Sequence, residues 1–348
     1  MINVNARSVS AQGEAFKPVV IERRDPGPLD VLIDIDFCGV CHSDVSHTRH
    51  SKGTTRYPIV PGHEIVGRVT AVGAQVSRFA VGDRAGVGCM VYSCRECESC
   101  KAGMEQYCRH EHIRTYNGIL DGEVTLGGYS EQIVVDENYV IPIPDSLTSA
   151  VAAPLLCAGI TMYSPLRHWQ VGPGSRVAIV GFGGLGHVGV QISAALGAHT
   201  TVLDIDDAKR ADAMRLGADD YRLTTDPEVF TELTESFDLI LSTVPAALDY
   251  DGLLGLLARD GTFVNLGVPK QPISIDVYSL LRKRRSMSGA RIGSIAETRE
   301  MLEFCGAHGI AAEIEMIDAD GLDEAFDRVE RGDVRYRFVL DVKTMSAI

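Results

Sequence analysis

The sequence predicts an α/β protein in which a β-rich part accompanies a doubly wound parallel sheet. Two patterns support this prediction. In the first 150 residues, apolar and polar side chains alternate with a period of two, as in half-buried strands. After about residue 150, short apolar runs alternate with helical segments, which is typical of parallel strands joined by helices. With 348 residues, the chain is long enough for two domains, each with its own core.

Three segments of the first part are predicted strands. Apolar residues from Val31 to Phe37 alternate with Asp34 and Asp36, so one face of this strand is apolar. Residues 65–72 and 131–135 show the same alternation, and Gly/Pro pairs separate the segments. We therefore expect a half-buried sheet here.

The second part predicts strands and helices in turn. Its expected strands are 176–180, 200–203, 238–241, 262–266 and 286–289, with helices at 185–196 and 208–216. After about residue 290, the pattern predicts helices at 296–305 and 322–329 and a last strand at 338–342.

Composition excludes several classes of protein. Hydrophobic residues make up 45% of the chain, too many for general disorder. The 33 basic and 47 acidic side chains give a net charge of −14, which argues against nucleic acid or an anionic membrane as the main partner. No run of 18 apolar residues occurs, and residues 1–12 lack the apolar core of a signal peptide. We expect a cytoplasmic protein.

Nine cysteines are the most informative feature of the composition. An odd number in a long chain without an export signal disfavours a disulfide scaffold. Cys94, Cys97, Cys100 and Cys108 lie within 15 residues, a spacing that lets one loop supply four thiolates to a structural zinc. The first three also fit an iron–sulfur ligand run, although no Cys-Pro follows. Cysteines that merely pack in the loop are disfavoured because the segment is polar.

A second metal site is predicted from Cys41, His63 with Glu64, and Cys157. Two thiolates and one imidazole leave a fourth position open, which is the pattern of catalytic rather than structural zinc. The residues are far apart in the sequence, so burial in the core is the competing interpretation.

A glycine-rich turn follows the apolar run 177–180 and opens a helix. Its residues are Gly181, Phe182, Gly183, Gly184, Leu185 and Gly186. Such a turn binds the pyrophosphate of a dinucleotide at the helix N-terminus, although a tight turn without a ligand looks similar. Asp204 ends the next strand, where a carboxylate accepts ribose hydroxyls of NAD and repels the 2′-phosphate of NADP. Lys209 and Arg210 partly offset that repulsion, so NAD(H) is favoured and NADP(H) stays possible.

The motifs together resemble zinc-dependent medium-chain alcohol dehydrogenases, in particular the cinnamyl alcohol dehydrogenase-like branch. The resemblance covers essentially the whole chain. It rests on Gly39-Val40-Cys41-His42-Ser43-Asp44, Gly62-His63-Glu64, Gly82-Asp83-Arg84, the loop ending Glu105-Gln106-Tyr107-Cys108, the segment 153–161 and Val334-Arg335-Tyr336-Arg337-Phe338.

The resemblance implies a GroES-like catalytic domain formed by residues 1–152 and 291–348, a Rossmann domain at 153–290, and a homodimer. It implies two zinc ions per chain, the catalytic one held by Cys41, His63 and Cys157 with Glu64 nearby. Ser43 would start a proton relay, Asp44 would orient the zinc-bound histidine, His42 would face the pyrophosphate, and Thr161 the nicotinamide.

Two positions depart from the family pattern. Family members often carry a histidine five residues after the first zinc ligand, whereas this chain has Ser46 there and His47 one step later. Either Ser46 passes the proton through water or His47 reaches the relay. The branch usually has serine or threonine at the position of Asp204 and uses NADP, so the residue present and the family average disagree.

We therefore expect a zinc-dependent alcohol dehydrogenase or aldehyde reductase acting on a small primary alcohol, aromatic or allylic, with no nucleic acid or membrane partner. The alternatives are a zinc-independent medium-chain reductase, a non-catalytic NAD-binding protein and a zinc-ribbon nucleic-acid binder, for which Arg282-Lys283-Arg284-Arg285 offers a basic run. Two zinc ions per chain would favour the zinc-dependent dehydrogenase. One zinc ion would favour the zinc-ribbon protein, and none would favour the zinc-independent reductase.

Overall fold

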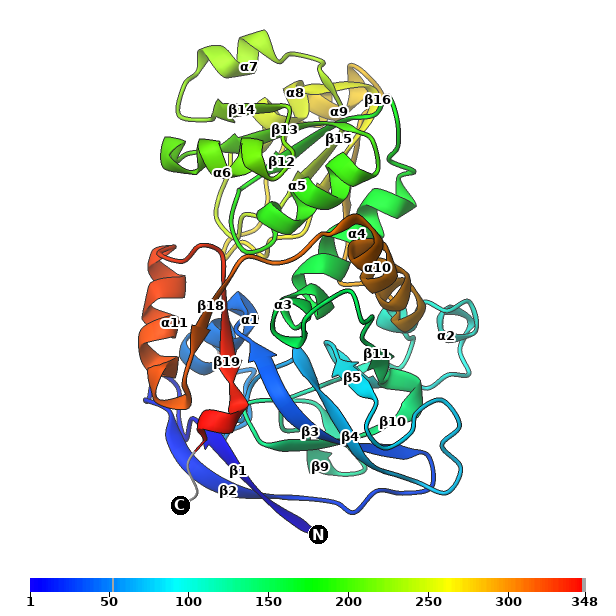
Figure 1. The fold of residues 1–348 in the computed structure, drawn as a ribbon. Helices are drawn as coiled ribbons and strands as arrows, with labels where there is room; N and C mark the ends of the chain where they lie inside the picture. Colours follow the sequence, from blue (N-terminus) through cyan, green and yellow to red (C-terminus); the bar gives the residue numbers. More distant parts are fainter. Residues whose placement is uncertain (52, 346–348) are drawn as a thin grey trace. The chain divides into compact units, whose positions relative to one another are not determined.

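The computed structural model describes residues 1–51 and 53–345 and divides the chain into two compact units. Unit 1 comprises Met1–Ile160 and Gly293–Ile348, and unit 2 comprises Thr161–Ile292 (Figure 1). The first division falls inside helix α4 (Ala158–His168), where a continuous helical segment leaves no local sign of a boundary. The sequence prediction had placed the divisions after residues 152 and 290.

Unit 1 is built on a seven-stranded sheet with the order β11-β5-β4-β3-β19-β18, in which β10 also pairs with β3. The strands are β3 (Asp30–Gly39), β4 (Ile65–Val72), β5 (Arg84–Val87), β10 (Gln132–Asp136), β11 (Ile141–Pro142), β18 (Ile314–Ile317) and β19 (Arg337–Asp341). The central strand β3 is antiparallel to β4, β10 and β19. Strands from both ends of the chain therefore share one sheet.

Short strand pairs and helices complete unit 1. The pairs are β1 (Ile2–Ser8) with β2 (Lys17–Arg23), β6 (Met90–Tyr92) with β7 (Ile113–Arg114), and β8 (Ile119–Leu120) with β9 (Glu123–Val124). The helices are α1 (His42–Arg49), α2 (Glu98–Lys101), α3 (Ser149–Ala152), α10 (Ile295–His308) and α11 (Leu322–Arg331). Single 3-10 turns lie at Glu105–Tyr107, Glu137–Tyr139, Pro154–Leu156, Ala319–Gly321 and Val342–Thr344. The first hairpin was not predicted, because only Val4 and Ala6 of β1 are core residues.

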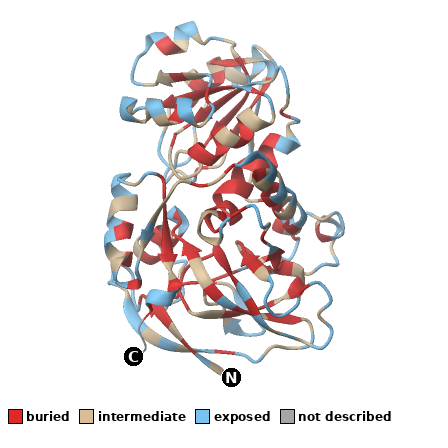
Figure 2. Ribbon diagram, in the orientation of Figure 1, coloured by how far each residue is buried: buried red, intermediate tan, exposed pale blue. Residues whose placement is uncertain are grey.

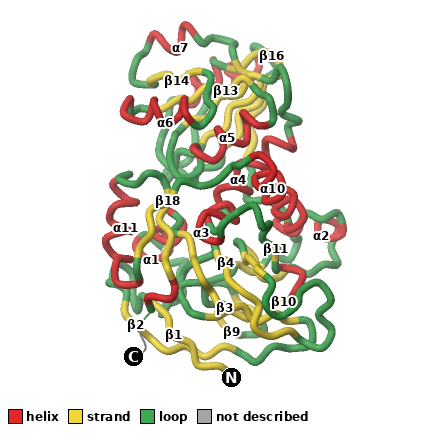
Figure 3. Tube along the Cα trace, viewed as in Figure 1, coloured by secondary structure: helices red, strands yellow, loops and turns green. Residues whose placement is uncertain are grey.

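Unit 2 contains a six-stranded parallel sheet with the order β14-β13-β12-β15-β16-β17. Its strands are β12 (Arg176–Val180), β13 (His199–Asp204), β14 (Asp220–Leu223), β15 (Phe237–Ser242), β16 (Leu257–Asn265) and β17 (Ser286–Gly289). In chain order this is 3-2-1-4-5-6, the doubly wound arrangement, whose order reverses between β12 and β15. Figure 3 shows these strands in yellow among red helices.

Helices cover both faces of this sheet. They are α5 (Gly186–Ala195), α6 (Arg210–Arg215), α7 (Glu228–Glu232), α8 (Tyr250–Gly255) and α9 (Val277–Leu281), with a 3-10 turn at Asp207–Lys209. Ala178 and Val180 of β12 pack in a core cluster with Leu253 and Leu254 of α8, whereas Ile179 between them approaches α5. Because successive residues face opposite sides, a fully apolar strand serves two helical layers. The central strands β12, β13 and β15 are accordingly mostly buried (Figure 2).

The fold prediction is confirmed: a β-rich unit accompanies a doubly wound unit with a parallel sheet. Strands β4, β12 and β17 have the predicted bounds. No single helix of the described part is long and apolar enough to cross a membrane, and only the bent pair Ser149–Leu156 and Ala158–His168 passes that test together.

Candidate active site

Four potential metal ligands from three separate parts of unit 1 meet in the interior. The ligand atoms of Cys41, His63, Glu64 and Cys157 all lie within 4.8 Å of one another, and all four residues are buried. Cys41 precedes α1, His63 and Glu64 precede β4, and Cys157 follows a 3-10 turn. The Sγ atoms of Cys41 and Cys157 are 3.9 Å apart, and His63 Nε2 lies 3.3 Å from Cys157 Sγ. Two thiols and one imidazole are a donor set that fits zinc.

The carboxylate of Asp44, which is fully buried, organises two of these ligands. Its Oδ2 accepts the backbone N–H of Cys41 at 2.9 Å, and its Oδ1 accepts the N–H of Gly62 at 3.2 Å. The same Oδ1 lies 3.2 Å from His63 Nδ1, and the Tyr129 hydroxyl donates to Oδ2 at 3.2 Å. Since Asp44 accepts the Nδ1 proton, the Nε2 lone pair of His63 is left to face the cysteines.

Glu64 forms a buried ion pair with Arg337 of β19. Burial raises the pKa of Glu64 to about 7, although Arg337 acts in the opposite direction. Glu64 Oε2 has no hydrogen-bond partner among the described residues, so an acceptor oxygen is left open beside the cysteines. An unpartnered buried carboxylate oxygen costs free energy unless a cation or proton satisfies it, which further fits a metal here.

The thiols of the cluster differ in acidity, since Cys41 raises the pKa of Cys157 well above its usual range. The neighbouring Cys157 thiol, followed by the His63 imidazole, lowers the pKa of Cys41 well below its usual range. Cys157 also lowers the pKa of Cys89, whose thiol therefore lies at the edge of this cluster. Its Sγ is 4.0 Å from the carbonyl oxygen of Leu156.

Helix α1 presents the predicted relay residues. The hydroxyl of Ser43 lies 3.6 Å from Cys41 Sγ, and His42 and Ser43 are both exposed. His47, four residues after Ser43, is on the same face of the helix. Its ring contacts Tyr116 at a centroid distance of 5.4 Å, and Tyr116 contacts His63 at 5.7 Å. Tyr116 was missed by sequence reasoning, because no motif marks it.

The four-cysteine loop forms the second cluster. The Sγ atoms of Cys94, Cys97, Cys100 and Cys108 lie within 4.8 Å of one another, and Figure 1 shows their loop, with α2, projecting from the rest of unit 1. The N–H of Cys97 donates to Cys94 Sγ at 3.3 Å, and the N–H of Arg109 donates to Cys97 Sγ at 3.4 Å. The Arg109 N–H, followed by that of Cys100, lowers the pKa of Cys97 to about 6. Four thiols with such donors fit a structural zinc.

In unit 2, the glycine-rich turn joins β12 to α5 as predicted. Gly181 has a φ of +92°, which disfavours any side chain. A Cβ on Gly186 would lie 2.0 Å from the carbonyl oxygen of Gly181, so only glycine lets the helix start this close. A Cβ on Gly183 would meet nothing within 4 Å, so open space remains beside the turn. Gly184 and Leu185 complete the turn, and Thr161 is buried in α4. The geometry fits a phosphate group at the start of α5.

Asp204 ends β13 beside this turn, but its carboxylate is already engaged. Oδ2 accepts the N–H of Phe182 at 2.6 Å, and Oδ1 accepts the N–H groups of Ile205 and Asp206 at 2.7 and 3.0 Å. Lys209 Nζ lies 3.6 Å from Oδ1. The sequence predicted the position of Asp204 at the end of a strand. It did not reveal that the carboxylate links the glycine-rich turn to the turn that follows β13.

Comparisons with known proteins agree with this arrangement. Residues 27–145 match the family model "Alcohol dehydrogenase GroES-like domain", and residues 184–307 match "Zinc-binding dehydrogenase". The chain is 54% identical over 346 residues to the NADP-dependent alcohol dehydrogenase C of Mycobacterium bovis, covering 99% of this chain and 100% of that protein. It is 50% identical to the aldehyde reductase YahK of Escherichia coli, with 99% and 100% coverage. A cinnamyl alcohol dehydrogenase structure from Sorghum bicolor superimposes with a TM-score of 0.97 at 38% identity, covering 100% of both chains.

The fold and the two cysteine-containing clusters thus define an alcohol–aldehyde oxidoreductase with a nicotinamide cofactor. More particularly, the chain belongs to the zinc-binding, medium-chain alcohol dehydrogenase family and resembles its cinnamyl alcohol dehydrogenase branch, as its motifs had indicated.

Proposed function

We propose that the chain is a zinc-dependent dehydrogenase that interconverts a primary alcohol and its aldehyde, with unit 1 catalytic and unit 2 binding the nicotinamide cofactor. The observation that carries the proposal is the buried set of Cys41, His63 and Cys157, whose histidine is oriented by Asp44. Three protein ligands leave one position for the substrate oxygen. Cys94, Cys97, Cys100 and Cys108 would hold a second, structural zinc.

The residues of unit 1 prepare the reaction. When bound, zinc supplies Lewis acidity toward the substrate oxygen, and the nicotinamide ring supplies the hydride acceptor or donor. Asp44 holds the Nδ1 proton of His63 and so orients its Nε2 toward the cysteines. Ser43, beside Cys41, takes the proton of the alcohol and passes its own to solvent, to which it is exposed. Beyond Ser43, the proton relay could pass through water near Ser46 or through His47. We favour water near Ser46, because Arg114 Nη1 occupies the Nε2 atom of His47.

The cofactor preference is proposed to be NAD(H). Asp204, Asp206 and Asp207 gather carboxylates at the end of β13. The two nearby cations are already paired, Lys209 with Asp204 and Arg210 with Asp207. A 2′-phosphate would therefore meet negative charge without a free cation. The mycobacterial relative is NADP-dependent by name, which makes a direct measurement necessary.

That measurement compares kcat/KM for NADH and NADPH with one aldehyde. We expect NADH to be preferred and Asp204→Ser to reduce the preference. A tenfold or greater preference of the unaltered protein for NADPH would overturn this assignment. His42, Thr161 and the turn from Gly181 to Gly186 are proposed to contact the cofactor, whichever form it takes.

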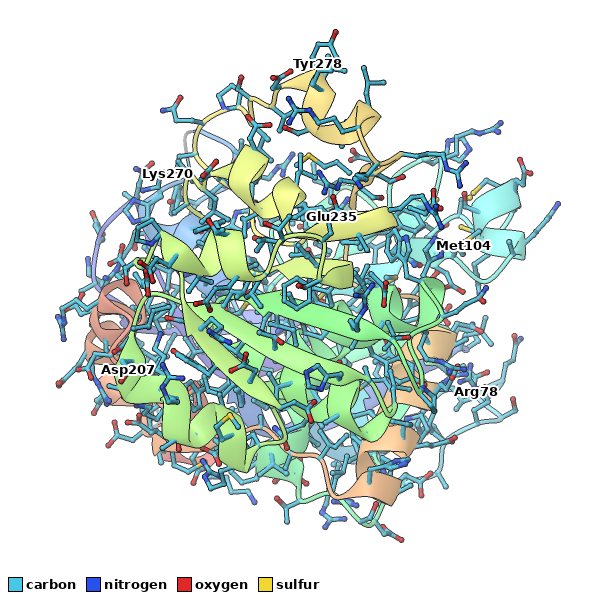
Figure 4. All side chains as sticks on the ribbon, turned by 90° about the horizontal axis from the view of Figure 1, so that it is seen from above. Arg78, Met104, Asp207, Glu235, Lys270 and Tyr278 are labelled. Atoms are coloured by element: carbon cyan, nitrogen blue, oxygen red, sulfur yellow. The ribbon has the colours of Figure 1, made fainter. Side chains whose placement is uncertain are left out.

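A homodimer is proposed through unit 2. Strand β17 ends its sheet and offers unpaired backbone groups. Beside it in sequence, α9 exposes Val277, Tyr278 and Leu281 by 57%, 60% and 64%, and Figure 4 shows Tyr278 pointing away from its helix. Light scattering should give twice the chain mass, and Leu281→Glu should give the monomer. A monomeric unaltered protein would refute the proposal.

The deciding experiment for the function combines metal analysis with turnover. We expect two zinc ions per chain and reduction of cinnamaldehyde, an aldehyde of the aromatic and allylic class suggested by the sorghum structure. One zinc would favour a zinc-ribbon protein, and no zinc a zinc-independent reductase. Two zinc ions without turnover of any aldehyde would favour a non-catalytic NAD-binding protein.

A further inference from the structure

The segment 113–117 forms one wall of the metal cluster in unit 1. The Tyr116 ring contacts His63, and the N–H of Thr115 donates to the carbonyl oxygen of Cys89 at 3.3 Å. Arg114 of β7 pairs with Met90 of β6 and is exposed. The backbone bends after Arg114, at residues 115–117. The ring of His47 contacts both Tyr116 and Arg114 Nη1, so the exposed guanidinium lies beside the wall residue that contacts a predicted zinc ligand.

His47 holds this arginine in place. Arg114 Nη1 lies 3.2 Å from His47 Nε2, and because a guanidinium only donates, Nε2 must be the acceptor. His47 Nδ1 lies 3.1 Å from Thr55 Oγ1 and 3.3 Å from Asn117 Nδ2. Burial, followed by the charge of Arg114, lowers the pKa of His47, which keeps the ring neutral. His47 thus holds the guanidinium of Arg114 in position.

Among the described residues, no carboxylate forms an ion pair with Arg114, whereas Arg49 on α1 pairs with Asp327 and Glu330. A second guanidinium belongs to the same network: Arg56, also exposed, donates to the carbonyl oxygen of Asn117 at 3.0 Å. One Nη1 bond leaves most donors of Arg114 free for a ligand.

We propose that Arg114 binds an anionic group of the substrate, so that this enzyme prefers aldehydes and alcohols carrying a carboxylate. The inference rests on the proposed function, because it concerns the far end of a molecule whose reacting oxygen lies at the Cys41–His63–Cys157 cluster. Arginine recognises carboxylates in a two-pronged geometry, and such charge-assisted bonds are stronger than neutral ones. Arg114 is a specificity-determining residue and takes no part in hydride or proton transfer.

The test compares two aldehydes of similar shape, 4-carboxybenzaldehyde and its methyl ester, on the zinc-loaded full chain with NADH and NADPH both supplied. At neutral pH the acid is ionised and the ester is uncharged. The unaltered enzyme should prefer the acid in kcat/KM, and the preference should fall as salt is added. Arg114→Gln should reduce the acid-to-ester ratio by about 10- to 100-fold, the usual worth of a charge-assisted bond.

Two variants serve as controls. Arg114→Lys should restore part of the ratio, because the charge returns without the planar fork. Arg68→Gln removes another exposed guanidinium, from β4, where it donates to the Gly82 carbonyl oxygen, and should leave the ratio unchanged. Titration calorimetry of 4-(hydroxymethyl)benzoate supplies a readout without turnover, and Arg114→Gln should weaken this binding by a similar factor.

The outcomes separate the two hypotheses. If both aldehydes are reduced and Arg114→Gln keeps the acid-to-ester ratio within about twofold of the unaltered enzyme, Arg114 has no such role and the proposed function stands. If neither aldehyde is reduced, the proposed function fails. The titration then decides the role of Arg114, which an unchanged affinity of the Gln variant would refute.

Discussion

The two metal-type clusters of unit 1 are built in opposite ways. Cys94, Cys97, Cys100 and Cys108 come from one loop of 15 residues, and backbone N–H groups of the same loop contact their sulfurs. Cys41, His63 and Cys157 come from three places along the chain, and buried side chains support them: Asp44 beneath His63 and Arg337 against Glu64. The four-cysteine loop thus supplies both the ligands and the N–H groups that contact them. The other cluster depends on the whole fold.

This difference predicts that the loss of one ligand has different effects in the two clusters. A local loop that loses a ligand should lose metal and stability there, with limited effect on distant chemistry. A cluster that gathers ligands from several elements and keeps one position open should lose activity first.

The largest expected effect is that of His63→Ala. Removing one of three ligands eliminates several kcal/mol of charge stabilisation at the substrate oxygen, so turnover should fall by about 10³-fold or more. Steady-state kinetics with cinnamaldehyde measures this. His50→Ala, which removes an exposed histidine paired with Glu330, should keep normal rates. A His63→Ala protein with normal turnover would contradict the catalytic assignment.

Asp44→Asn should cost about 10- to 100-fold in zinc affinity at the open cluster, measured by competition with a chelator. The amide cannot accept the Nδ1 proton of His63 and also serve every N–H that the carboxylate now accepts. Tyr129→Phe removes a single bond to Asp44 and should cost less. Equal affinities in both variants would show that Asp44 does not orient the ligand.

Cys100→Ser tests the local cluster. We expect one zinc per chain instead of two and a melting temperature lower by several degrees, since a structural zinc adds folding free energy. Turnover of the protein that remains folded should stay within a few-fold. Cys305→Ala removes a buried thiol outside both clusters and should keep two zinc ions. A variant with both zinc ions retained would rule out the loop as a metal site.

The smallest effect concerns an ion pair that belongs to neither cluster. Burial opposes ionisation of Asp30, but Arg24 and the Gly27 N–H outweigh it and lower its pKa. A lowered pKa gives stability that is complete above the unfolded value near 4 and disappears as pH falls through the folded value. Asp30→Asn should therefore cost about 1–2 kcal/mol at pH 7, discounted because Arg24 is half exposed, and less at pH 3. Urea unfolding at both pH values measures it; a pH-independent difference would contradict this account.

The comparison also shows what sequence reasoning can reach. The spacing of its cysteines alone predicts the thiol loop, and an apolar run followed by glycines predicts the β12–turn–α5 junction. Both predictions succeed because the interacting residues are close in the chain. The grouping of Cys41, His63 and Cys157 required a family resemblance, since no local rule joins positions 41 and 157.

Residues acting over long sequence distances were missed for the same reason. Arg337 comes directly before the predicted strand 338–342, but nothing near it indicates Glu64 as its partner. Tyr116 and Arg114 follow the thiol loop without periodicity or punctuation. Asp204 was placed at the right strand end, yet its three N–H partners depend on backbone turns that a residue pattern does not specify.

The strand order of unit 1 bears on how the protein is made. Strand β19 lies between β3 and β18, and its Arg337 neutralises Glu64, yet it follows the whole of unit 2 in the sequence. During translation unit 2 can thus fold as a complete body, while the sheet of unit 1 still lacks β19 and Glu64 has no counter-charge. The synthesis of β19 is therefore the event that completes this sheet.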